Sequence, residues 1–290
     1  MTDAGRTAIV VEGGAMRGVF SAGVLDVFLE NHFDPFDLAI GVSAGACNLA
    51  SHLAGQHGRN RRSYFDLMTR REFIDRRRLL RGGSIIDLDW LWDALAEREP
   101  LDVEAIARGA TEFIVVATSR RTGEAVYLRP GPDQMCDALK ASSALPILYR
   151  RDTVLAGERL VDGGVSDPIP AEAAYRRGAR RIVVVRSRPA AAVKTDGLSA
   201  RTMAWLLRHE PAFAMAVRAT AARYRQSVAF LNEPPPDCEV LQVAPPAPLA
   251  TKRTTQDRAA LQRDYDLGRA LGAQAIRVFQ EKGGPPRGAG

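Results

Sequence analysis

Short apolar runs alternate with helix-like segments along most of the chain, and this alternation predicts an α/β fold. Strands buried on both faces of a parallel sheet are short and almost continuously apolar, whereas helices repeat their apolar positions every three or four residues. Runs of the first kind lie at Thr7–Val11, Phe36–Ile40, Glu112–Thr118 and Arg181–Arg186, and helical patterns lie at Val19–Glu30, Ala44–Ala54, Asn60–Met68, Asp133–Ser142 and Ala171–Arg177. This order predicts a central, mostly parallel sheet flanked by helices.

Two hairpins add antiparallel strands to this sheet. Ala125–Arg129 follows a polar turn and pairs back on the run that begins at Glu112, and Val154–Ala156 faces Arg159–Val161 across a two-residue turn. The segment Arg70–Asp93 is less regular. Its tryptophans, Trp90 and Trp92, either pack in the core or belong to an exposed flap that touches a membrane.

The pattern changes near residue 188. Pro189–Gly197 has the composition of a linker, and beyond it three helical segments surround one strand candidate: Leu198–His209, Pro211–Leu231, Thr255–Glu281 and the strand Glu239–Val243. We therefore predict an α/β domain over residues 7–188, a mainly helical C-terminal extension packed on it over residues 198–282, and a disordered tail over residues 283–290.

A G-x-S-x-G pattern, Gly41-Val42-Ser43-Ala44-Gly45, joins the second strand to the following helix. A serine in so sharp a turn needs small neighbours, and Gly41 and Gly45 let the backbone bend without clashes. The hydroxyl then projects from the turn while the helix N-terminus points at it. This is the geometry of a nucleophile elbow.

A glycine-rich turn, Glu12-Gly13-Gly14-Ala15-Met16-Arg17-Gly18, lies between the first strand and the first helix. Free backbone N–H groups gather at such a turn and favour an anion. Three interpretations compete: a phosphate site, a plain tight turn and a site for a transient oxyanion. The phosphate site lacks the lysine of a P-loop and a strict G-x-G-x-x-G. The nearby serine elbow favours the oxyanion.

A serine nucleophile needs a base, and none of the four histidines is well placed. His52 lies nine residues after Ser43, roughly 13 Å along the helix and near its opposite face. His32 lies at the end of the first helix and His57 just beyond the second, and His209 lies in the C-terminal extension beside a helix-breaking proline. Asp162 is the alternative, because it follows a short strand and precedes Gly163-Gly164. Such a tripeptide taken alone is most often only a turn.

These three motifs together resemble the patatin-like phospholipase family, over about residues 7–188 and in the same order. The segment Ala141-Ser142-Ser143-Ala144-Leu145-Pro146 is similar to the stretch that precedes the family's acid motif. The C-terminal segment Asp264-Tyr265-Asp266-Leu267-Gly268-Arg269 resembles the extension of a bacterial subgroup. The resemblance implies a three-layer patatin-like α/β fold with a mainly helical C-terminal extension.

The resemblance also implies roles for the motif residues. Ser43 and Asp162 would form a catalytic dyad without histidine. The oxyanion hole would be built from Gly13, Gly14, Ala15, Arg17, Gly18 and Ala44, and Gly41, Gly45, Gly163 and Gly164 would shape the elbow and the acid motif. Arg17 would either neutralise the loop region or fix the loop by hydrogen bonds.

Three positions depart from the family pattern. The family usually has Asp at Glu12, a third glycine at Ala15 and often Asn at Asp167. Alanine fits position 15 only if its φ angle is negative. None of these changes removes a catalytic atom.

Charge leaves the choice of partner open. The formal net charge is +6, and arginines cluster at Arg59–Arg62, Arg70–Arg71, Arg76–Arg81 and Arg176–Arg181. A solvated arginine-rich surface and an attraction to anionic lipid headgroups both explain them. Nucleic acid is disfavoured, because no helix-turn-helix, zinc-finger or RNP pattern accompanies the charge. The composition does not indicate an oligomeric state.

Other sequence features bear on the cellular location of the protein and on its need for cofactors. No apolar run is long enough for a transmembrane helix, and the N-terminus has no secretory pattern. The three cysteines, Cys47, Cys136 and Cys238, are far apart, which fits reduced thiols in the cytoplasm, with peripheral membrane contact as an addition. We expect no metal, because neither cysteine ligand spacing nor an EF-hand loop is present, and no cofactor.

Several functions compete. The first is a serine lipid acyl hydrolase, that is, a phospholipase A, lysophospholipase or carboxylesterase that forms an acyl-enzyme. The second is a non-catalytic lipid-binding or regulatory protein of the same family, which the intact Ser43 and Asp162 disfavour. The third is an α/β-hydrolase with a hidden histidine such as His209. The last is nucleotide or phosphate binding by the first loop.

Overall fold

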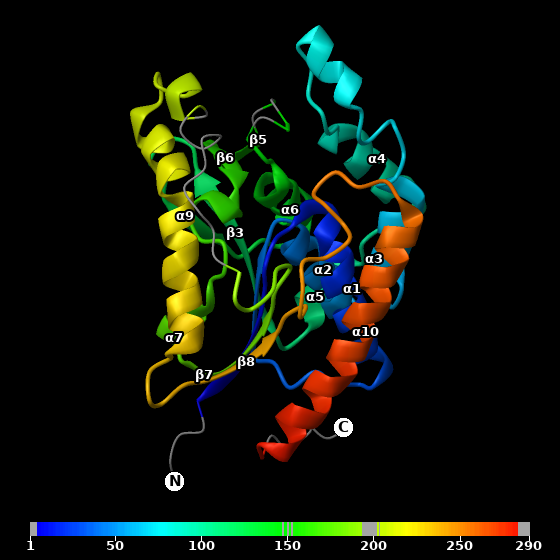
Figure 1. Ribbon diagram of the computed structural model, residues 1–290, viewed down its shortest axis with the longest axis vertical. Coiled ribbons are helices and arrows are strands. Elements are labelled where there is room, and N and C mark those ends of the chain that lie inside the picture. Colours follow the sequence, from blue (N-terminus) through cyan, green and yellow to red (C-terminus); the bar gives the residue numbers. More distant parts are fainter. Residues whose placement is uncertain are drawn as a thin grey trace.

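A computed structural model describes residues 5–146, 148, 149, 151, 153–192, 202 and 204–283. It contains a mixed, mostly parallel sheet with helices on both faces, so the predicted fold class is confirmed (Figure 1). The parallel strands are β1 (Arg6–Val11), β2 (Leu38–Val42), β3 (Glu112–Ser119), β7 (Ala179–Val185) and β8 (Glu239–Val243); the antiparallel strands are β4 (Ala125–Leu128), β5 (Thr153–Leu155) and β6 (Glu158–Asp162). Their order is β5-β6-β3-β2-β1-β7-β8, and β4 pairs with β3.

Alternate residues of the central strands face two different helical layers. Ile9 and Val11 of β1 pack in a core with α1 (Gly18–Glu30), α2 (Ala44–Leu53) and α10 (Arg258–Glu281). Ala8 and Val10 pack in a second core with α7 (Ala171–Arg176) and α9 (Pro211–Asn232). Burial on both faces explains why these strands read as continuous apolar runs.

Shorter helical segments connect and cover the strands and the longer helices. They are the 3-10 turns η1 (Ala15–Arg17), η3 (Arg76–Arg81), η4 (Pro132–Gln134) and η5 (Gly163–Val165), the π-helical segment η2 (Ser63–Leu67), and the helices α3 (Arg59–Arg62), α4 (Leu88–Arg98), α5 (Val103–Arg108) and α6 (Met135–Ser143). In the described part of the chain, no helix is both long enough and apolar enough to cross a membrane.

Two sequence expectations about these elements were wrong. The second strand begins at Leu38 and continues through Val42, because Gly41 and Val42 pair with Val115 and Val116 of β3. The segment that looked irregular ends in α4, which begins at Leu88 and is capped by Asp87, whose carboxylate accepts a hydrogen bond from the N–H of Trp90. Such a cap supplies a partner for an otherwise free helix N-terminus.

Helix α10 of the C-terminal extension lies directly against α1. A Cβ on Gly23 would come within 2.2 Å of Tyr265 O, and one on Gly268 within 2.1 Å of Phe20 O. The two backbones therefore approach closely where both helices carry glycine. Arg269 donates to both carboxylate oxygens of Glu30 at 2.7 and 2.8 Å. The segment that resembled a bacterial extension is thus the docking surface of α10.

The domain limits stay predictions. Most of the proposed linker and the proposed disordered tail lie outside the described residues, as do residues 198–201 and 203 of the predicted helix Leu198–His209. The remaining helices and the strand of the extension, from Pro211 onward, agree with the predicted pattern.

The two edges of β3 explain how distant motifs meet. Strand β4 pairs along Val115–Thr118 on one edge, so β2 and β6 must share the other. Val42 is opposite Val116, and Asp162 is opposite the next residue, Ala117. Strand β2 therefore ends where β6 ends, which brings the serine turn and Asp162 to the same point of the sheet.

Candidate active site

Ser43 lies in the turn between β2 and α2 with strained backbone angles. Its φ is 55° and its ψ is −129°, a region that costs about 1–3 kcal/mol for a residue with a side chain. A Cβ on Gly41 would lie 2.4 Å from Ala46 Cα, and one on Gly45 would lie 2.4 Å from Val11 O. Only glycine fits at either position, and helix α2 can therefore begin immediately after the strand.

A hydrogen bond from the serine backbone helps to hold this turn. The N–H of Ser43 donates to Ser142 Oγ at 2.7 Å, and Ser142 Oγ donates to Val116 O at 2.6 Å. All these groups are buried. Ser142, at the end of α6, thus links the elbow to β3 and fixes the direction in which Ser43 faces.

Asp162 is buried at the end of β6 and is held by several hydrogen bonds. Its N–H donates to Ala144 O at 3.0 Å, and its carbonyl accepts from Thr118 Oγ1 at 2.8 Å. Its Oδ1 accepts from the N–H of Gly164 at 2.8 Å. A Cβ on Gly163 would lie 2.2 Å from Val116 O, so the turn after Asp162 requires glycine there. The carboxylate is therefore placed by the sheet rather than by a flexible loop.

The glycine-rich loop passes beside the serine. A Cβ on Gly13 would lie only 2.9 Å from Ser43 Cβ. Within the described residues, the backbone N–H groups of Gly13, Gly14 and Ala15 donate no hydrogen bond. The N–H of Ala44, the first residue of α2, has no acceptor within its own helix. This arrangement provides backbone donors for an anion next to the serine.

Two family models match the chain. One, described as patatin-like phospholipase, matches residues 9–175, more than half of the sequence. The chain belongs to the patatin-like phospholipase family. The other, a domain of unknown function named DUF6363, matches residues 210–281.

Several proteins are similar to this family member. YjjU of Escherichia coli (strain K12) is 38% identical over 273 residues, which cover 92% of this chain and 76% of YjjU. The NTE family protein Rv1063c of Mycobacterium tuberculosis is 28% identical over 57% of this chain and 44% of its own length. The crystal structure of VipD from Legionella pneumophila gives a TM-score of 0.46 at 12% identity, covering 95% of this chain and 67% of VipD.

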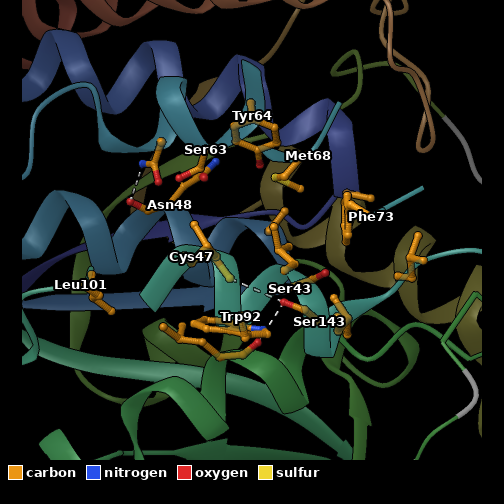
Figure 2. Close-up of a pocket in the computed structure, with 18 of the residues that line it drawn as sticks. Ser43, Cys47, Asn48, Ser63, Tyr64, Met68, Phe73, Trp92, Leu101 and Ser143 are labelled. Carbon is orange, nitrogen blue, oxygen red and sulfur yellow. Dashed lines mark hydrogen bonds between the residues drawn. The ribbon is translucent and has the colours of Figure 1, made fainter. Parts of the chain in front are cut away.

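In this patatin-like protein, an apolar pocket opens beside Ser43 (Figure 2). Its empty volume, part of which is open to solvent, is about 740 Å³. Apolar side chains from several elements line it: Met68, Phe73, Leu88, Leu91, Trp92, Leu95, Leu101 and Leu139. Ala15 and Ala44 lie in the wall next to the serine, so the N–H donors and the pocket share one space.

The polar groups of the pocket wall are largely satisfied by the protein. Asn48 Nδ2 donates to Gly18 O at 2.8 Å, and Asn60 Nδ2 donates to Asn48 O at 3.1 Å. Arg59 donates to Glu99 O at 2.9 Å and to Ser51 Oγ at 2.8 Å, and burial lowers its pKa. Arg59 and Asn60 are buried, so part of this arginine cluster is not the solvated surface that the sequence suggested.

No histidine among the described residues lines this pocket. His52 is buried with its ring centroid 6.5 Å from that of Phe28, and burial lowers its pKa. His57 Nε2 lies 2.8 Å from Glu30 Oε1 at the surface. Cys47 does line the pocket, but burial raises its pKa to about 11, which keeps the thiol protonated near neutral pH. Ser43 is therefore the better candidate nucleophile.

The tryptophans resolve the two interpretations of the segment before α4. Trp92 lines the pocket, and Trp90 is partly buried against the core that contains Tyr64, Phe73 and Leu91. The interpretation of the two tryptophans as exposed side chains is therefore wrong. Trp92 forms part of the pocket wall, and Trp90 packs behind it against the same core.

Ala15 and Arg17 differ from what the motif suggested. Ala15 has a φ of 51°, so the expectation that alanine requires a negative φ here was wrong; the loop keeps its left-handed conformation at a cost of about 1–2 kcal/mol. Within the described residues, the side chain of Arg17 makes no hydrogen bond, and its buried Nε has no partner. Arg17 therefore does not fix the loop by hydrogen bonds. Burial lowers its pKa to about 10, yet the side chain remains cationic near neutral pH.

Glu12 and the end of β7 hold the loop instead. The N–H of Ser187 donates to Glu12 Oε2 at 2.8 Å, and Ser187 Oγ donates to Gly13 O at 2.9 Å. Burial raises the pKa of Glu12, although Arg17 and this hydrogen bond oppose that change. The sequence does not indicate a role for Ser187, because this residue follows an ordinary strand. Ser142 was noted only as part of the segment that is similar to the stretch before the family's acid motif.

We expect Ala15→Gly to raise the free energy of unfolding slightly. The substitution removes about 1–2 kcal/mol of left-handed strain, and the greater freedom of the unfolded chain offsets about 0.4–1 kcal/mol of that gain. The measurement is urea unfolding. In the control Ala270→Gly, on the exposed face of α10, the free energy of unfolding should fall by about 1 kcal/mol. If the free energy of unfolding fell by the same amount in both variants, the strain at Ala15 would be contradicted.

Proposed function

We propose that the protein is a serine lipid acyl hydrolase in which Ser43 is the nucleophile and Asp162 the base. One observation carries this proposal: β2 and β6 end side by side on the same edge of β3. That pairing brings Ser43 and Asp162 together without any histidine. Membership of the patatin-like phospholipase family supports the class of reaction.

The proposed reaction proceeds in two halves. Ser43 Oγ attacks the carbonyl carbon of an ester while Asp162 accepts its proton. The tetrahedral oxyanion receives hydrogen bonds from free N–H groups of Gly13, Gly14, Ala15 and Ala44, each typically contributing about 3–4 kcal/mol. As the intermediate collapses, the proton passes from Asp162 to the leaving alcohol, and Ser43 stays acylated. Asp162 then takes a proton from a water molecule as its oxygen attacks the acyl-enzyme carbonyl. When this second intermediate collapses, the bond to Ser43 Oγ breaks, Asp162 returns the proton to Ser43 Oγ, and the fatty acid leaves.

The pocket suggests which part of the substrate lies where. Its wall next to Ser43 is apolar and includes Leu91, Trp92 and Leu101. An acyl chain buried there would gain about 0.8 kcal/mol for each methylene group. This favours esters of fatty acids as substrates. Phospholipase A, lysophospholipase and carboxylesterase activities all act on such esters.

The competing function is lipid binding without catalysis. A binding protein has no need of a strained serine, a buried acid and unused N–H donors at one point. Those features are expected for a site that stabilises a transition state. Hydrolysis of an ester by the purified protein separates the two functions.

We expect two variants to lose the hydrolysis of nitrophenyl butyrate. Ser43→Ala removes the nucleophile and should lower kcat at least about 10³-fold, and Asp162→Asn should lower kcat about 10²- to 10⁴-fold. Asp167→Asn is the matched control, because it makes the same change five residues later, where the carboxylate accepts a hydrogen bond from Tyr127 at 2.7 Å. His209→Ala tests for a hidden triad.

The controls should keep kcat within a few-fold of the wild-type value. If His209→Ala were inactive and Asp162→Asn fully active, the dyad would be wrong. If the wild-type protein hydrolysed no ester, the lipid-binding function would replace the enzyme.

We also propose that the protein contacts anionic membranes through the segment just before α9 and the first turns of that helix. Trp205, Leu206 and Met215 are 62%, 56% and 72% exposed, and with Val154 they are the exposed large apolar side chains of the described residues. Arg208 stacks on the ring of Trp205 at 4.7 Å, and exposed Arg151 and Arg159 belong to the neighbouring hairpin region. Aromatic groups beside arginines suit the interface of an anionic bilayer.

Co-sedimentation with vesicles should detect this contact. We expect binding to vesicles containing phosphatidylglycerol, weaker binding at 0.5 M NaCl, and a further loss in a Trp205→Ala/Met215→Ala double variant. Arg176→Gln, in an exposed pair with Glu172 on α7, removes one charge elsewhere and serves as the control. Binding that is the same in the double variant and the wild-type protein would contradict this surface.

A further inference from the structure

Arginines from three separate segments gather at the loop beside Ser43. Arg17 belongs to the loop itself, Arg188 follows the end of β7, and Arg253 lies in the connection between β8 and α10. All three interact electrostatically with one another and with Glu12, and Arg253 also interacts with Asp162. The cluster therefore extends from the glycine-rich loop to the acid of the proposed dyad.

The positive charge of this cluster exceeds the negative charge that faces it. Arg188 Nε lies 3.9 Å from Glu12 Oε1, a loose ion pair, while Glu12 also accepts a hydrogen bond from Ser187. In the described part of the chain, the side chains of Arg17 and Arg253 form neither an ion pair nor a hydrogen bond with another residue. Arginine side chains gathered without matching carboxylates are unfavourable unless an anion joins them.

The C-terminal extension holds Arg253 in place. Its carbonyl accepts a hydrogen bond from the N–H of Met16 at 3.5 Å, in the turn that follows the free N–H donors. Two residues earlier, the N–H of Thr251 donates to Asp264 Oδ2 at 2.7 Å. Asp264 lies on α10, which docks on α1. The docking of α10 thus holds Arg253 against the glycine-rich loop.

We propose that Arg188 and Arg253, next to Arg17, form a subsite for a phosphate group that is part of the ester substrate. The inference rests on the proposed function and adds the headgroup chemistry that the apolar pocket leaves undefined. A guanidinium group presents paired N–H donors that match phosphate oxygens, and a partly desolvated site strengthens each contact. The acyl chain would occupy the pocket on one side of Ser43 and the phosphate the arginines on the other.

The extension therefore contributes to selectivity as well as to stability. Arg17 belongs to the same loop as the proposed oxyanion donors, so its loss would affect every ester. Arg253 lies outside that loop, and its side chain makes no ion pair or hydrogen bond with another described residue, so it can be replaced with little effect on folding. Arg253 is for this reason the residue to test.

The test compares two esters that share one acyl chain, 1-palmitoyl-lysophosphatidylglycerol and 1-palmitoylglycerol, in neutral detergent micelles. We expect Arg253→Gln and Arg188→Gln to lower kcat/KM about 10- to 100-fold for the phosphate ester and less than about 3-fold for the neutral ester. Lys252→Gln, an exposed neighbour without an ion pair in the described structure, removes the same charge and should change neither value. The subsite proposal would be overturned if kcat/KM fell equally for both esters. It would also be overturned if Lys252→Gln lowered kcat/KM for the phosphate ester as much as Arg253→Gln does.

A second measurement separates a lipid phosphate from free phosphate. If inorganic phosphate inhibits hydrolysis of the neutral ester, and Arg253→Gln relieves that inhibition without changing the preference between the two esters, the site binds a free anion and the headgroup proposal is wrong. Hydrolysis of 1-palmitoylglycerol by the wild-type protein, and its loss in Ser43→Ala, reports the proposed function separately. The ratio of the kcat/KM values for the two esters reports the subsite alone.

Discussion

The pairing of β3 with two different strands on one edge is the constraint on which the site depends. A strand edge accepts only one neighbour at each residue, so β6 can pair with β3 only beyond the point where β2 ends. This places Asp162 next to the turn that carries Ser43, although the two residues are far apart in sequence. The required glycines follow from the same crowding, because Gly41, Gly45 and Gly163 each lie against backbone atoms that leave no room for a side chain.

The loop after β1 completes the site from the other side. It is held through Glu12 and Gly13 by Ser187, at the end of the neighbouring strand β7. The loop accepts the strain of Ala15 because several segments fix it at once. The C-terminal extension reaches the same loop through Arg253, so the regions matched by the two family models contact each other there.

Much of the fold could be read from the sequence because the buried strands and amphipathic helices have distinct periodicities. The limits of β2 could not, since Gly41 and Val42 are strand residues only through their partners on β3. Helix α4 was missed although Leu88, Leu91 and Leu95 repeat at helical spacing and Asp87 is a readable cap, because the basic, glycine-containing stretch before it is irregular. The motifs could be recognised from neighbouring residues alone. The roles of Ser142, Ser187 and Arg253 could not, because each depends on a hydrogen bond to a residue far away in the sequence.

The sign of φ at Ala15 illustrates the same limit. The residue type argued for a negative angle, but the surrounding loop imposes a positive one. Arg17 likewise looked like a residue that fixes the loop, yet it makes no hydrogen bond among the described residues. In both cases tertiary contacts, invisible in a single sequence, outweigh the local preference of the residue.

The most direct test of the central claim is covalent labelling of the nucleophile. The protein is treated with a fluorophosphonate that carries an alkyl chain, and the adduct is located by mass spectrometry of the peptides. We predict a single adduct on Ser43 that forms at least about 10²-fold more slowly in Asp162→Asn and at an unchanged rate in Asp167→Asn. An adduct on another residue, or labelling of Asp162→Asn at the wild-type rate, would contradict a serine activated by Asp162.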